Sequence, residues 1–432
     1  MAASAAFARV RQQIEYAYEN VSFVRDHMTR AGVEPCDLRG PDDLRRVPPT
    51  RKPDYRRGFP ARVIAAGYGL RSRHVRRFTS SGTDGDRLVS VAFSYDLARR
   101  QATCLEFNDR FGALWRPGLR QRTCRLAAPA CSDVECSTPS SSRVQRLLPD
   151  GTLVLPVYHD LLTTPRAVAA QALDELAAYD PHLLFADPTH LAFLVRAMRA
   201  LGGRPHRREG FCIASAYTLC TQVARRQIRE CYGPHVPLAD MLGMSEIGYL
   251  GLECPEGRMH INSSDYYLEF VCGDQPAETG KLAELIITTL EDELSPRIRY
   301  ATGDLYRLTG ERCPCGSSAL VVSLEGRARN MLCHRMGIAL TPRELDDVVG
   351  PAPWIDLYQM SQDDLEEFTF RYLPNQARSG REESDLRERL CDALGTDMVR
   401  CIATPYIPAD RGGKFLSCVS SVARQREWSG AE

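Results

Sequence analysis

The alternation of apolar runs with helical patterns through the middle of the chain constrains the fold most. The apolar runs are 152–157, 183–186 and 211–214. The segments of helical spacing between and after them are 166–179, 189–201 and 218–230. Strands that alternate with helices usually pair as parallel neighbours through βαβ crossovers. The sequence therefore predicts an α/β core built on a buried, parallel sheet.

The pattern changes further along the chain. Residues 265–310 alternate in polarity, which predicts antiparallel hairpins. Beyond Gly326 and Arg327 comes a mixture of helix and strand patterns, about a hundred residues that could fold alone. We therefore expect a large N-terminal domain, 1–325, with mixed βαβ-type sheets and an antiparallel β subdomain, and a small, mobile α+β domain, 326–432.

Bulk properties exclude several classes of protein. The 432 residues carry a formal net charge of +0. The chain as a whole therefore lacks the excess positive charge that is typical of proteins that bind nucleic acid or a membrane surface. No apolar run reaches membrane-spanning length, and the N-terminus does not resemble a secretory signal. Most of the 16 cysteines sit singly in apolar contexts, as expected in a reducing compartment. We expect a cytoplasmic protein.

Lysine is scarce in this chain. Lys52, Lys281 and Lys414 are the only lysines among 55 basic residues. Because arginine is the default cation here, a retained lysine hints that its compact ammonium group matters.

A loop rich in hydroxyls and glycine follows a basic stretch. Four hydroxyls and two glycines fall within Thr79–Gly85, and an alternating apolar segment comes next. Glycine lets backbone N–H groups approach a phosphate closely, and serine and threonine add donors. The loop lacks the Gly-Lys-Ser/Thr ending of a Walker loop. By itself it fits a phosphate cradle between strands or an ordinary polar turn.

Several stretches in the same order resemble the adenylate-forming enzymes. They are Thr79–Gly85, Asp240–Glu246, Ile298–Leu305, Gly326–Leu332 and Gly412–Lys414. Phe23–Arg25, Ala31–Val33 and Lys52 resemble the phenylacetate–CoA ligase branch in particular. The resemblance implies ATP-dependent, AMP-forming activation of a small carboxylic acid. A nucleophile, in the family usually the thiol of coenzyme A, then takes the acyl group after the small domain rotates.

The resemblance also implies residue roles. Lys414 would bridge the carboxylate and the α-phosphate, Glu246 would bind Mg²⁺, and Ser245 would lie near the α-phosphate. The remaining nucleotide-binding positions are Ser80, Ser81, Gly82, Thr83, Gly85, Ser215, Ala216, Tyr217, Asp240, Met241, Leu242, Gly243, Asp304 and Arg327. Asp304 would hold the ribose; on local pattern alone, it also fits a turn after Gly303.

The chain departs from the family pattern at positions expected to serve adenylation and at positions expected to serve acyl transfer. Leu242 replaces the aromatic residue that usually stacks on adenine, and Tyr217 is a candidate substitute ring. Other departures are Asp84, Asp86 and Arg87 in the loop, Arg329 at the hinge, and Met336 and Ala339 near the coenzyme A tunnel. The tunnel changes favour an alternative in which an amine or hydroxyl of a small molecule accepts the acyl group. A further alternative is a nucleotide-binding protein without catalysis.

The acyl pocket is expected at the strand ends. Its predicted lining is Tyr158, His159, His190, Met244, Gly248 and Tyr249. This mixture of rings and small residues suits an aryl acid better than a long alkyl chain. The expected partners are therefore a small carboxylic acid and an acyl acceptor, with a homodimer as a family expectation.

Four residues outside these motifs fit a metal site. Cys254, His260, Cys313 and Cys315 would supply three thiolates and one imidazole, a common tetrahedral zinc shell. Phenylacetate–CoA ligase relatives with this arrangement look zinc-binding. The alternative is two unrelated turns with free thiols. With four protein ligands, the zinc would be structural.

Overall fold

The computed structural model describes residues 2–80, 87–115, 121–128, 137–158, 160–335, 337–375 and 380–425. Contacts divide the chain into two units. The first is chiefly Met1–Phe107 with Gly243–Leu324, and the second is chiefly Asn108–Leu242 with Glu325–Trp428. One junction between the units, at Leu324 and Glu325, falls beside the domain boundary expected from the sequence. The division into 1–325 and 326–432 itself stays a prediction.

No helix among the described residues is long and apolar enough to cross a membrane.

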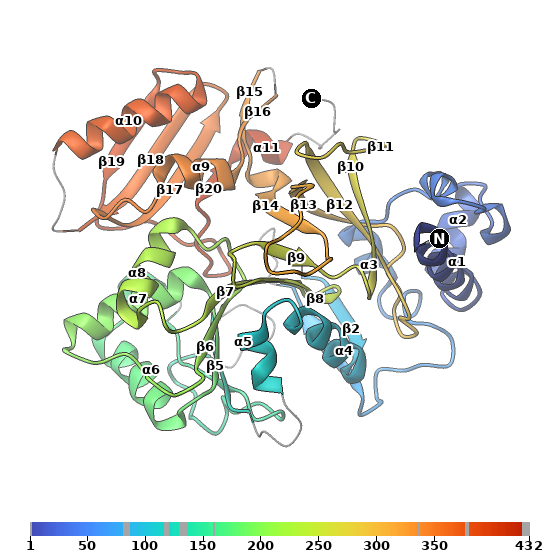
Figure 1. Ribbon diagram of the computed structural model, residues 1–432, viewed down its shortest axis with the longest axis horizontal. Coiled ribbons are helices and arrows are strands. Elements are labelled where there is room, and N and C mark those ends of the chain that lie inside the picture. Colours follow the sequence, from blue (N-terminus) through green and yellow to red (C-terminus); the bar gives the residue numbers. More distant parts are fainter. Residues whose placement is uncertain are drawn as a thin grey trace. The chain divides into compact units, whose positions relative to one another are not determined.

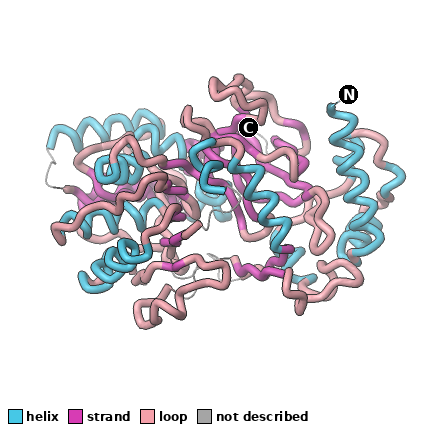
Figure 2. Tube along the Cα trace, turned by 60° about the horizontal axis from the view of Figure 1, so that its bottom comes forward, coloured by secondary structure: helices cyan, strands magenta, loops and turns pink. Residues whose placement is uncertain are grey.

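The first unit opens with helices and a hairpin. These elements are α1 (Ala2–Asn20), α2 (Ser22–Arg30), η1 (Pro35–Asp37), η2 (Pro41–Arg46), α3 (Lys52–Gly58), β1 (Val75–Thr79), β2 (Val89–Phe93) and α4 (Ser94–Leu105). Helices α1 and α2 lie side by side near the N-terminus (Figure 2). Strands β1 and β2 pair antiparallel, with Thr79 opposite Val89. The hydroxyl-rich loop therefore follows the end of a hairpin strand, as the sequence predicts.

Antiparallel strands make up the rest of the first unit. They are β8 (Gly248–Glu253), β9 (Met259–Ile261), β10 (Tyr266–Cys272), β11 (Gln275–Pro276), β12 (Leu282–Thr289), β13 (Tyr300–Leu308) and β14 (Val321–Arg327), whose last residues lie beyond the unit. One run pairs in the order β11-β10-β12-β13, and another pairs β8 with β9 and β9 with β14. The prediction of antiparallel strands for 265–310 is confirmed.

A parallel sheet forms the core of the second unit. Its strands are β3 (Thr123–Leu126), β4 (Leu153–Val154), β5 (Leu183–Ala186), β6 (Cys212–Ser215) and β7 (Leu238–Met244), in the order β7-β6-β5-β3-β4. The predicted α/β class is confirmed. The apolar run 152–157 contributes only the two residues of β4. Pro156 in this run has no backbone N–H to donate to a neighbouring strand.

Helices flank this parallel sheet. They are α5 (Asp109–Gly112), η3 (Ala113–Trp115), η4 (Leu161–Thr163), α6 (Arg166–Tyr179), α7 (Pro188–Ala200) and α8 (Gln222–Tyr232). All four residues of β5 and of β6 are buried, as expected for central parallel strands. Figure 1 shows α6, α7 and α8 in green beside these strands. The sheet is thus a rigid support whose strand ends can position side chains.

The second unit ends in a smaller mixture of helices and strands with a four-stranded sheet. Its elements are η5 (Ala328–Asn330), β15 (Leu332–His334), β16 (Gly337–Leu340), α9 (Pro342–Val349), β17 (Ile355–Asp364), β18 (Glu367–Pro374), α10 (Gly380–Leu394), β19 (Val399–Ala403), β20 (Cys418–Ser420) and α11 (Ser421–Gln425). Strands pair in the order β19-β18-β17-β20, and α10 lies along this sheet (Figure 1). The mixture of helices and strands expected after Arg327 is found.

Contacts tie these C-terminal elements to α8 and η4. Asp346 of α9 accepts hydrogen bonds from the Gln222 backbone at 3.0 and 3.1 Å and from the Tyr358 hydroxyl at 2.8 Å. Leu161, Ile407 and Phe415 form a small apolar cluster. The turn that carries Lys414 is therefore packed within the same unit as the parallel sheet.

Candidate active site and metal centre

Polar side chains gather at the carboxyl ends of β5 and β6. We call Asp187, His190, Ser215, Tyr217, Thr218 and Lys414 the strand-end cluster. Ala186 and Ser215, the last residues of the two strands, pair directly in the sheet. The carboxyl ends of parallel strands are the usual place for a ligand in open α/β sheets. The cluster is therefore the candidate active site of this unit.

Tyr217 holds an unusual backbone conformation in this cluster. Its φ is 76°, in the left-handed region that bulky residues rarely adopt. Such a conformation costs about 1–3 kcal/mol and persists where its surroundings impose it. Ala216 donates its N–H to Ala186 O at 2.9 Å, which fixes the turn at the end of β6. The strained backbone aims the Tyr217 carbonyl at a cation.

That cation is Lys414. Its Nζ donates to Tyr217 O at 3.4 Å. Asp410 shapes the lysine turn, because its Oδ1 accepts from the backbone N–H groups of Gly412 and Lys414, both at 2.8 Å. The structure thus brings Lys414 to the Ser215–Tyr217 segment, two elements that lie almost 200 residues apart in sequence.

Asp187 and His190 form a buried pair at the start of α7. Asp187 is the N-cap of the helix, and its Oδ1 accepts from the backbone N–H groups of Thr189 at 3.0 Å and His190 at 3.2 Å. The same Oδ1 lies 3.1 Å from His190 Nδ1, and Oδ2 accepts from the Thr218 hydroxyl at 3.0 Å. Burial alone would raise the pKa of Asp187, but His190 and the hydrogen bonds lower it below its ordinary value.

The Asp240–Gly243 segment forms most of β7. Asp240 pairs with Arg225 of α8 at 3.0 Å, and Met241 is buried. Ser215 on the neighbouring strand is also buried, and its hydroxyl has no partner among the described residues. Ser215 therefore keeps an unused hydrogen bond at the predicted nucleotide position.

The predicted phosphate cradle is described only at its first residue. Ser80 is buried, and its Oγ accepts from the Leu88 N–H at 2.9 Å. This bond closes the β1–β2 hairpin in front of the loop. Ser81, Gly82, Thr83, Asp84, Gly85 and Asp86 lie outside the described residues, and their roles stay predictions.

Glu246 follows β7 in the first unit. Its Oε1 lies 3.7 Å from Lys52 Nζ at the start of α3, and the Glu246 side chain is only 10% exposed. Ser245 precedes it in the same turn, where the Ile247 N–H bonds to Met244 O at 3.2 Å. The sequence did not predict this pairing of Lys52 with the proposed Mg²⁺ ligand, although the scarcity of lysine marked Lys52.

Asp304 lies within β13, not in a turn between elements. Its N–H donates to the Thr302 hydroxyl at 3.1 Å, and Gly303 before it has a φ of 73°. Arg327 ends β14 and is exposed. Next to it, Gly326 has no room for a side chain, because a Cβ there would meet the Pro342 ring at 2.6 Å. The predicted hinge at Arg327 therefore lies next to a tightly packed glycine.

The predicted acyl-pocket residues fall in both units. His190 belongs to the strand-end cluster, and Tyr158 of the same unit is exposed. Met244, Gly248 and Tyr249 belong to the first unit, where Gly248 has a φ of 88°. His159 and Met336 lie outside the described residues.

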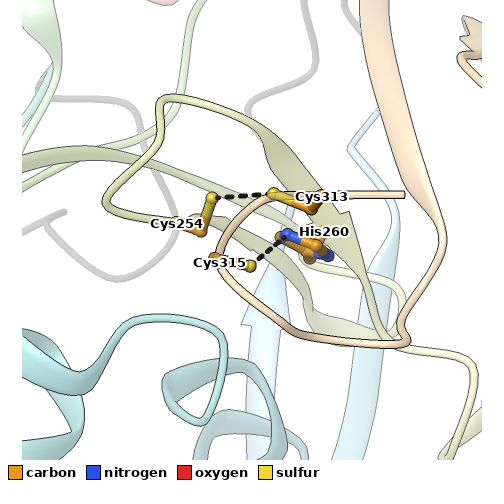
Figure 3. A group of neighbouring side chains, drawn as sticks. All are labelled: Cys254, His260, Cys313 and Cys315. Carbon is orange, nitrogen blue, oxygen red and sulfur yellow. Dashed lines mark hydrogen bonds between the residues drawn. The ribbon is translucent and has the colours of Figure 1, made fainter. Parts of the chain in front are cut away.

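The four predicted metal ligands come together in the first unit. Cys254 follows β8, His260 lies on β9, and Cys313 and Cys315 lie between β13 and β14 (Figure 3). Their ligand atoms all fall within 4.8 Å of one another. His260 Nδ1 lies 3.2 Å from Ala319 O, so Nδ1 carries the hydrogen and Nε2 faces the sulfurs. The residues are those that sequence alone had grouped.

The spacing of these atoms suits one small cation. Cys254 Sγ and Cys313 Sγ are 3.6 Å apart, and Cys315 Sγ is 3.3 Å from His260 Nε2. Tetrahedral zinc would separate two sulfurs by about 3.8 Å and a sulfur from a nitrogen by about 3.6 Å, given its usual bond lengths. All four cysteine and histidine side chains therefore lie close to metal-binding geometry.

Comparison with known proteins finds similar enzymes. No family model matches the chain. A phenylacetate–coenzyme A ligase of Thermus thermophilus is 29% identical over 352 residues, which cover 80% of this chain and 74% of the relative. The Escherichia coli enzyme of the same name is 27% identical over 361 residues, with 79% and 74% covered. The chain is thus similar to the phenylacetate–coenzyme A ligases, which matches the branch of adenylate-forming enzymes that its motifs resemble. The resemblance drawn from its motifs is confirmed.

Solved structures agree on the fold of this family. A 2-hydroxyisobutyryl-CoA ligase bound to an acyl adenylate matches with a TM-score of 0.74 and 18% identity, covering 98% of this chain and 90% of that one. An amide bond synthetase from Marinactinospora thermotolerans matches with a TM-score of 0.54 and 15% identity, covering 81% and 69%. The adenylate-forming fold predicted from the sequence is thereby confirmed.

Sequence reasoning missed the Asp187–His190–Thr218 linkage. It placed the Asp187–His190 segment at the acyl pocket but did not predict the pairing of the two side chains or the bond from Thr218. A signal was present: Asp187 and His190 are three residues apart, directly after a buried strand and at the start of a helix. That spacing puts both side chains on one helix face.

Proposed function

We propose that the chain activates a small aryl carboxylic acid with ATP and then transfers the acyl group to a nucleophile. The first step would form an acyl adenylate and release pyrophosphate. One observation carries the proposal: Lys414 Nζ reaches the ends of the parallel strands, 3.4 Å from Tyr217 O. In a phenylacetate–coenzyme A ligase-like chain, that is where a cation can meet the reacting carboxylate and phosphate.

Electrostatics gives each proposed residue its task in adenylation. Lys414 would offset the negative charge that develops between the carboxylate and the α-phosphate. Glu246 would hold Mg²⁺, which neutralises phosphate charge when bound. In this scheme Lys52 keeps the Glu246 carboxylate compensated when the metal is absent. Asp304 and Arg327 would hold the ribose and the adenylate.

Tyr217 would supply the aromatic surface for adenine. Leu242 stands where the family usually has that ring, so base binding needs another partner. Tyr217 lies two residues beyond β6, and its ring is partly buried against Ala127, Ala128 and Val154. Its left-handed backbone keeps it in one place.

The acyl acceptor separates two versions of the proposal. Coenzyme A is the family's usual acceptor, whereas an amine or hydroxyl of another small molecule is the alternative. The alternative is favoured because Met336 and Ala339 replace an arginine and an asparagine near the expected coenzyme A tunnel. Comparing AMP formation with coenzyme A, aryl amines and phenols as acceptors distinguishes the two.

We further propose that the Cys254, His260, Cys313 and Cys315 site binds structural zinc. Four protein ligands leave no open position for substrate, so the metal would only pin the loops together. The observed separations of 3.6 Å and 3.3 Å support this assignment.

A panel of aryl acids tests the proposed activity. Purified protein, ATP and Mg²⁺ are mixed with each acid, and pyrophosphate release is measured together with the mass of the product. We expect release with at least one aryl acid and a product mass equal to its adenylate. If no acid supports release while ATP still binds, the chain is a nucleotide-binding protein and the proposal fails.

A further inference from the structure

The strand-end cluster contains a histidine whose ring is held on one side only. His190 is 1% exposed, and its Nδ1 lies 3.1 Å from Asp187 Oδ1. No described residue hydrogen-bonds to Nε2 on the other side of the ring. An imidazole nitrogen without a protein partner can accept a hydrogen bond or a proton from a ligand.

We propose that His190 is the general base of the acyl-transfer step and that Asp187 orients it. The inference rests on the proposed function. It names the group that takes the proton from the acceptor, whether thiol, amine or hydroxyl. Asp187 acts through His190 and is a positioning residue.

The Asp187 carboxylate decides which imidazole nitrogen is basic. The approach of Nδ1 to Oδ1 is too bent for a regular hydrogen bond, so the contact is chiefly electrostatic. A carboxylate repels a bare nitrogen lone pair, and Nδ1 therefore carries the hydrogen. The neutral ring then presents Nε2 as the proton acceptor. Hydrogen bonds from Thr189 N, His190 N and the Thr218 hydroxyl fix the carboxylate in turn.

The same contacts connect His190 to the proposed adenylation site. Thr218, which binds Asp187 Oδ2 at 3.0 Å, directly follows Tyr217. The Tyr217 carbonyl accepts from Lys414 Nζ at 3.4 Å. One short turn after β6 therefore contacts both the proposed base and the proposed adenylation lysine. An acyl group held by Lys414 would lie in the part of the unit that contains His190.

Capping of α7 does not account for the histidine. Asp187 caps the helix through two backbone N–H groups, and this role requires no imidazole at position 190. An apolar side chain would fill a fully buried position without leaving a nitrogen unsatisfied. The helix cap therefore does not explain the imidazole, and Nε2 stays available for chemistry.

The step balances as a nucleophilic acyl transfer. The acceptor heteroatom attacks the acyl carbon while its proton moves to His190 Nε2. A new bond forms between the acyl carbon and the heteroatom, and the bond from that carbon to the adenylate oxygen breaks. AMP leaves with the electron pair, and the imidazolium returns its proton to AMP or to water. No oxidant or reductant takes part.

A pair of histidine variants tests the assignment. His190→Gln keeps a polar side chain but removes the base. His182→Gln is the matched control, because His182 is also buried in this unit and lies just before β5, where its Nδ1 accepts from Arg122 N at 3.1 Å. Pyrophosphate release reports adenylation. Transfer is measured at pH 7.5 from the adenylate to coenzyme A, an aryl amine or a phenol, whichever the wild type uses, and also to hydroxylamine.

A general base contributes about 100-fold or more to such a step, so we expect transfer by His190→Gln to fall by at least that factor. Adenylation should stay within about threefold of wild type, since proton removal from the acceptor plays no part in it. Hydroxylamine is uncharged and strongly nucleophilic at neutral pH, so its reaction should be spared. His182→Gln should leave all three rates unchanged. Asp187→Asn retains the helix cap and should slow transfer without slowing adenylation.

Other outcomes overturn the inference. If hydroxylamine reacts as slowly as the natural acceptor, or if adenylation falls in step with transfer, His190 only shapes the pocket. If transfer by His190→Gln is unchanged, the base lies elsewhere. A wild-type protein that adenylates no acid defeats the proposed function itself. A wild type that adenylates an acid but transfers it only to hydroxylamine defeats this inference alone.

Discussion

The predicted metal cluster, formed by Cys254, His260, Cys313 and Cys315, and the strand-end cluster are both polar sites, but their bonding is opposite. In the metal cluster, three sulfurs and one nitrogen face one another within 4.8 Å, and His260 is fixed from behind by Ala319 O. In the strand-end cluster, Ser215 Oγ and His190 Nε2 have no partners among the described residues. Lys414 reaches its acceptor at a long 3.4 Å.

The backbones differ in the same way. Around the metal cluster the left-handed positions are glycines, Gly257 and Gly316, which adopt that conformation without strain. In the strand-end cluster the left-handed position is Tyr217. A site that serves stability satisfies its own groups, whereas a site that serves chemistry keeps strain and unused hydrogen bonds for a ligand. Four substitutions test this contrast.

The largest effect is expected at Lys414. Lys414→Ala should lower the rate of adenylation about 100- to 1000-fold, because it removes a preorganised charge from the reacting phosphate. Consumption of a preformed adenylate should change only a few-fold. Pyrophosphate release and adenylate consumption, measured separately, check both parts.

Lys281→Ala is the matched control for that experiment. Lys281 is exposed between β11 and β12, and its removal should leave both rates unchanged. An unaffected first step in Lys414→Ala would refute the role of the lysine.

The metal cluster should affect stability and not chemistry. Purified wild type should hold about one zinc per chain, and Cys315→Ser should lower that content and the melting temperature by at least about 3 °C, roughly 1 kcal/mol. Metal analysis and thermal unfolding provide the measurements. Cys36→Ser, at an exposed cysteine outside the cluster, should change neither quantity.

Less than half an equivalent of zinc in the wild type would contradict the metal assignment. A Cys315→Ser variant that lost its zinc but kept its thermal stability would contradict the structural role of the metal, because the metal would then not stabilise the loops.

The smallest effect is expected at the strained backbone. Tyr217→Gly should change the free energy of unfolding by less than about 1 kcal/mol, because relief of the left-handed strain offsets the lost ring packing. Its Michaelis constant for ATP should rise several-fold if the ring covers adenine. Gly316→Ala should instead destabilise by about 1 kcal/mol, since that glycine has a φ of 84°.

Denaturant unfolding and ATP kinetics check this pair of variants. A loss of about 3 kcal/mol in Tyr217→Gly, typical of deleting a core aromatic residue, would show that the ring is structural and its backbone unstrained.

The sequence predicted the regular elements well because their signals are local. The buried run 183–186 and the periodic segment 166–179 reappear with the same bounds. The strand at 152–157 shrank to Leu153–Val154 in a run that contains a proline. The predicted metal ligands could be grouped from sequence because cysteine and histidine have few roles in such turns.

Contacts between distant segments were beyond the reach of local patterns. Nothing near Lys414 in sequence indicates that Tyr217 O is its acceptor, and nothing near Glu246 indicates Lys52. The Asp187–Thr218 bond joins the ends of neighbouring strands, and the register between those strands is set by the sheet.

The sequence by itself determined the fold class, the family resemblance and the candidate functional residues of this protein, because periodicity and motif order can be read along the chain without its fold. Only the tertiary structure decided which side chains meet. It set the Cys254, His260, Cys313 and Cys315 atoms around one point and left His190 Nε2 and Ser215 Oγ unpaired among the described residues. The physical reason is that hydrogen bonds and metal ligation act over about 3 Å, and only folding brings distant residues within that range.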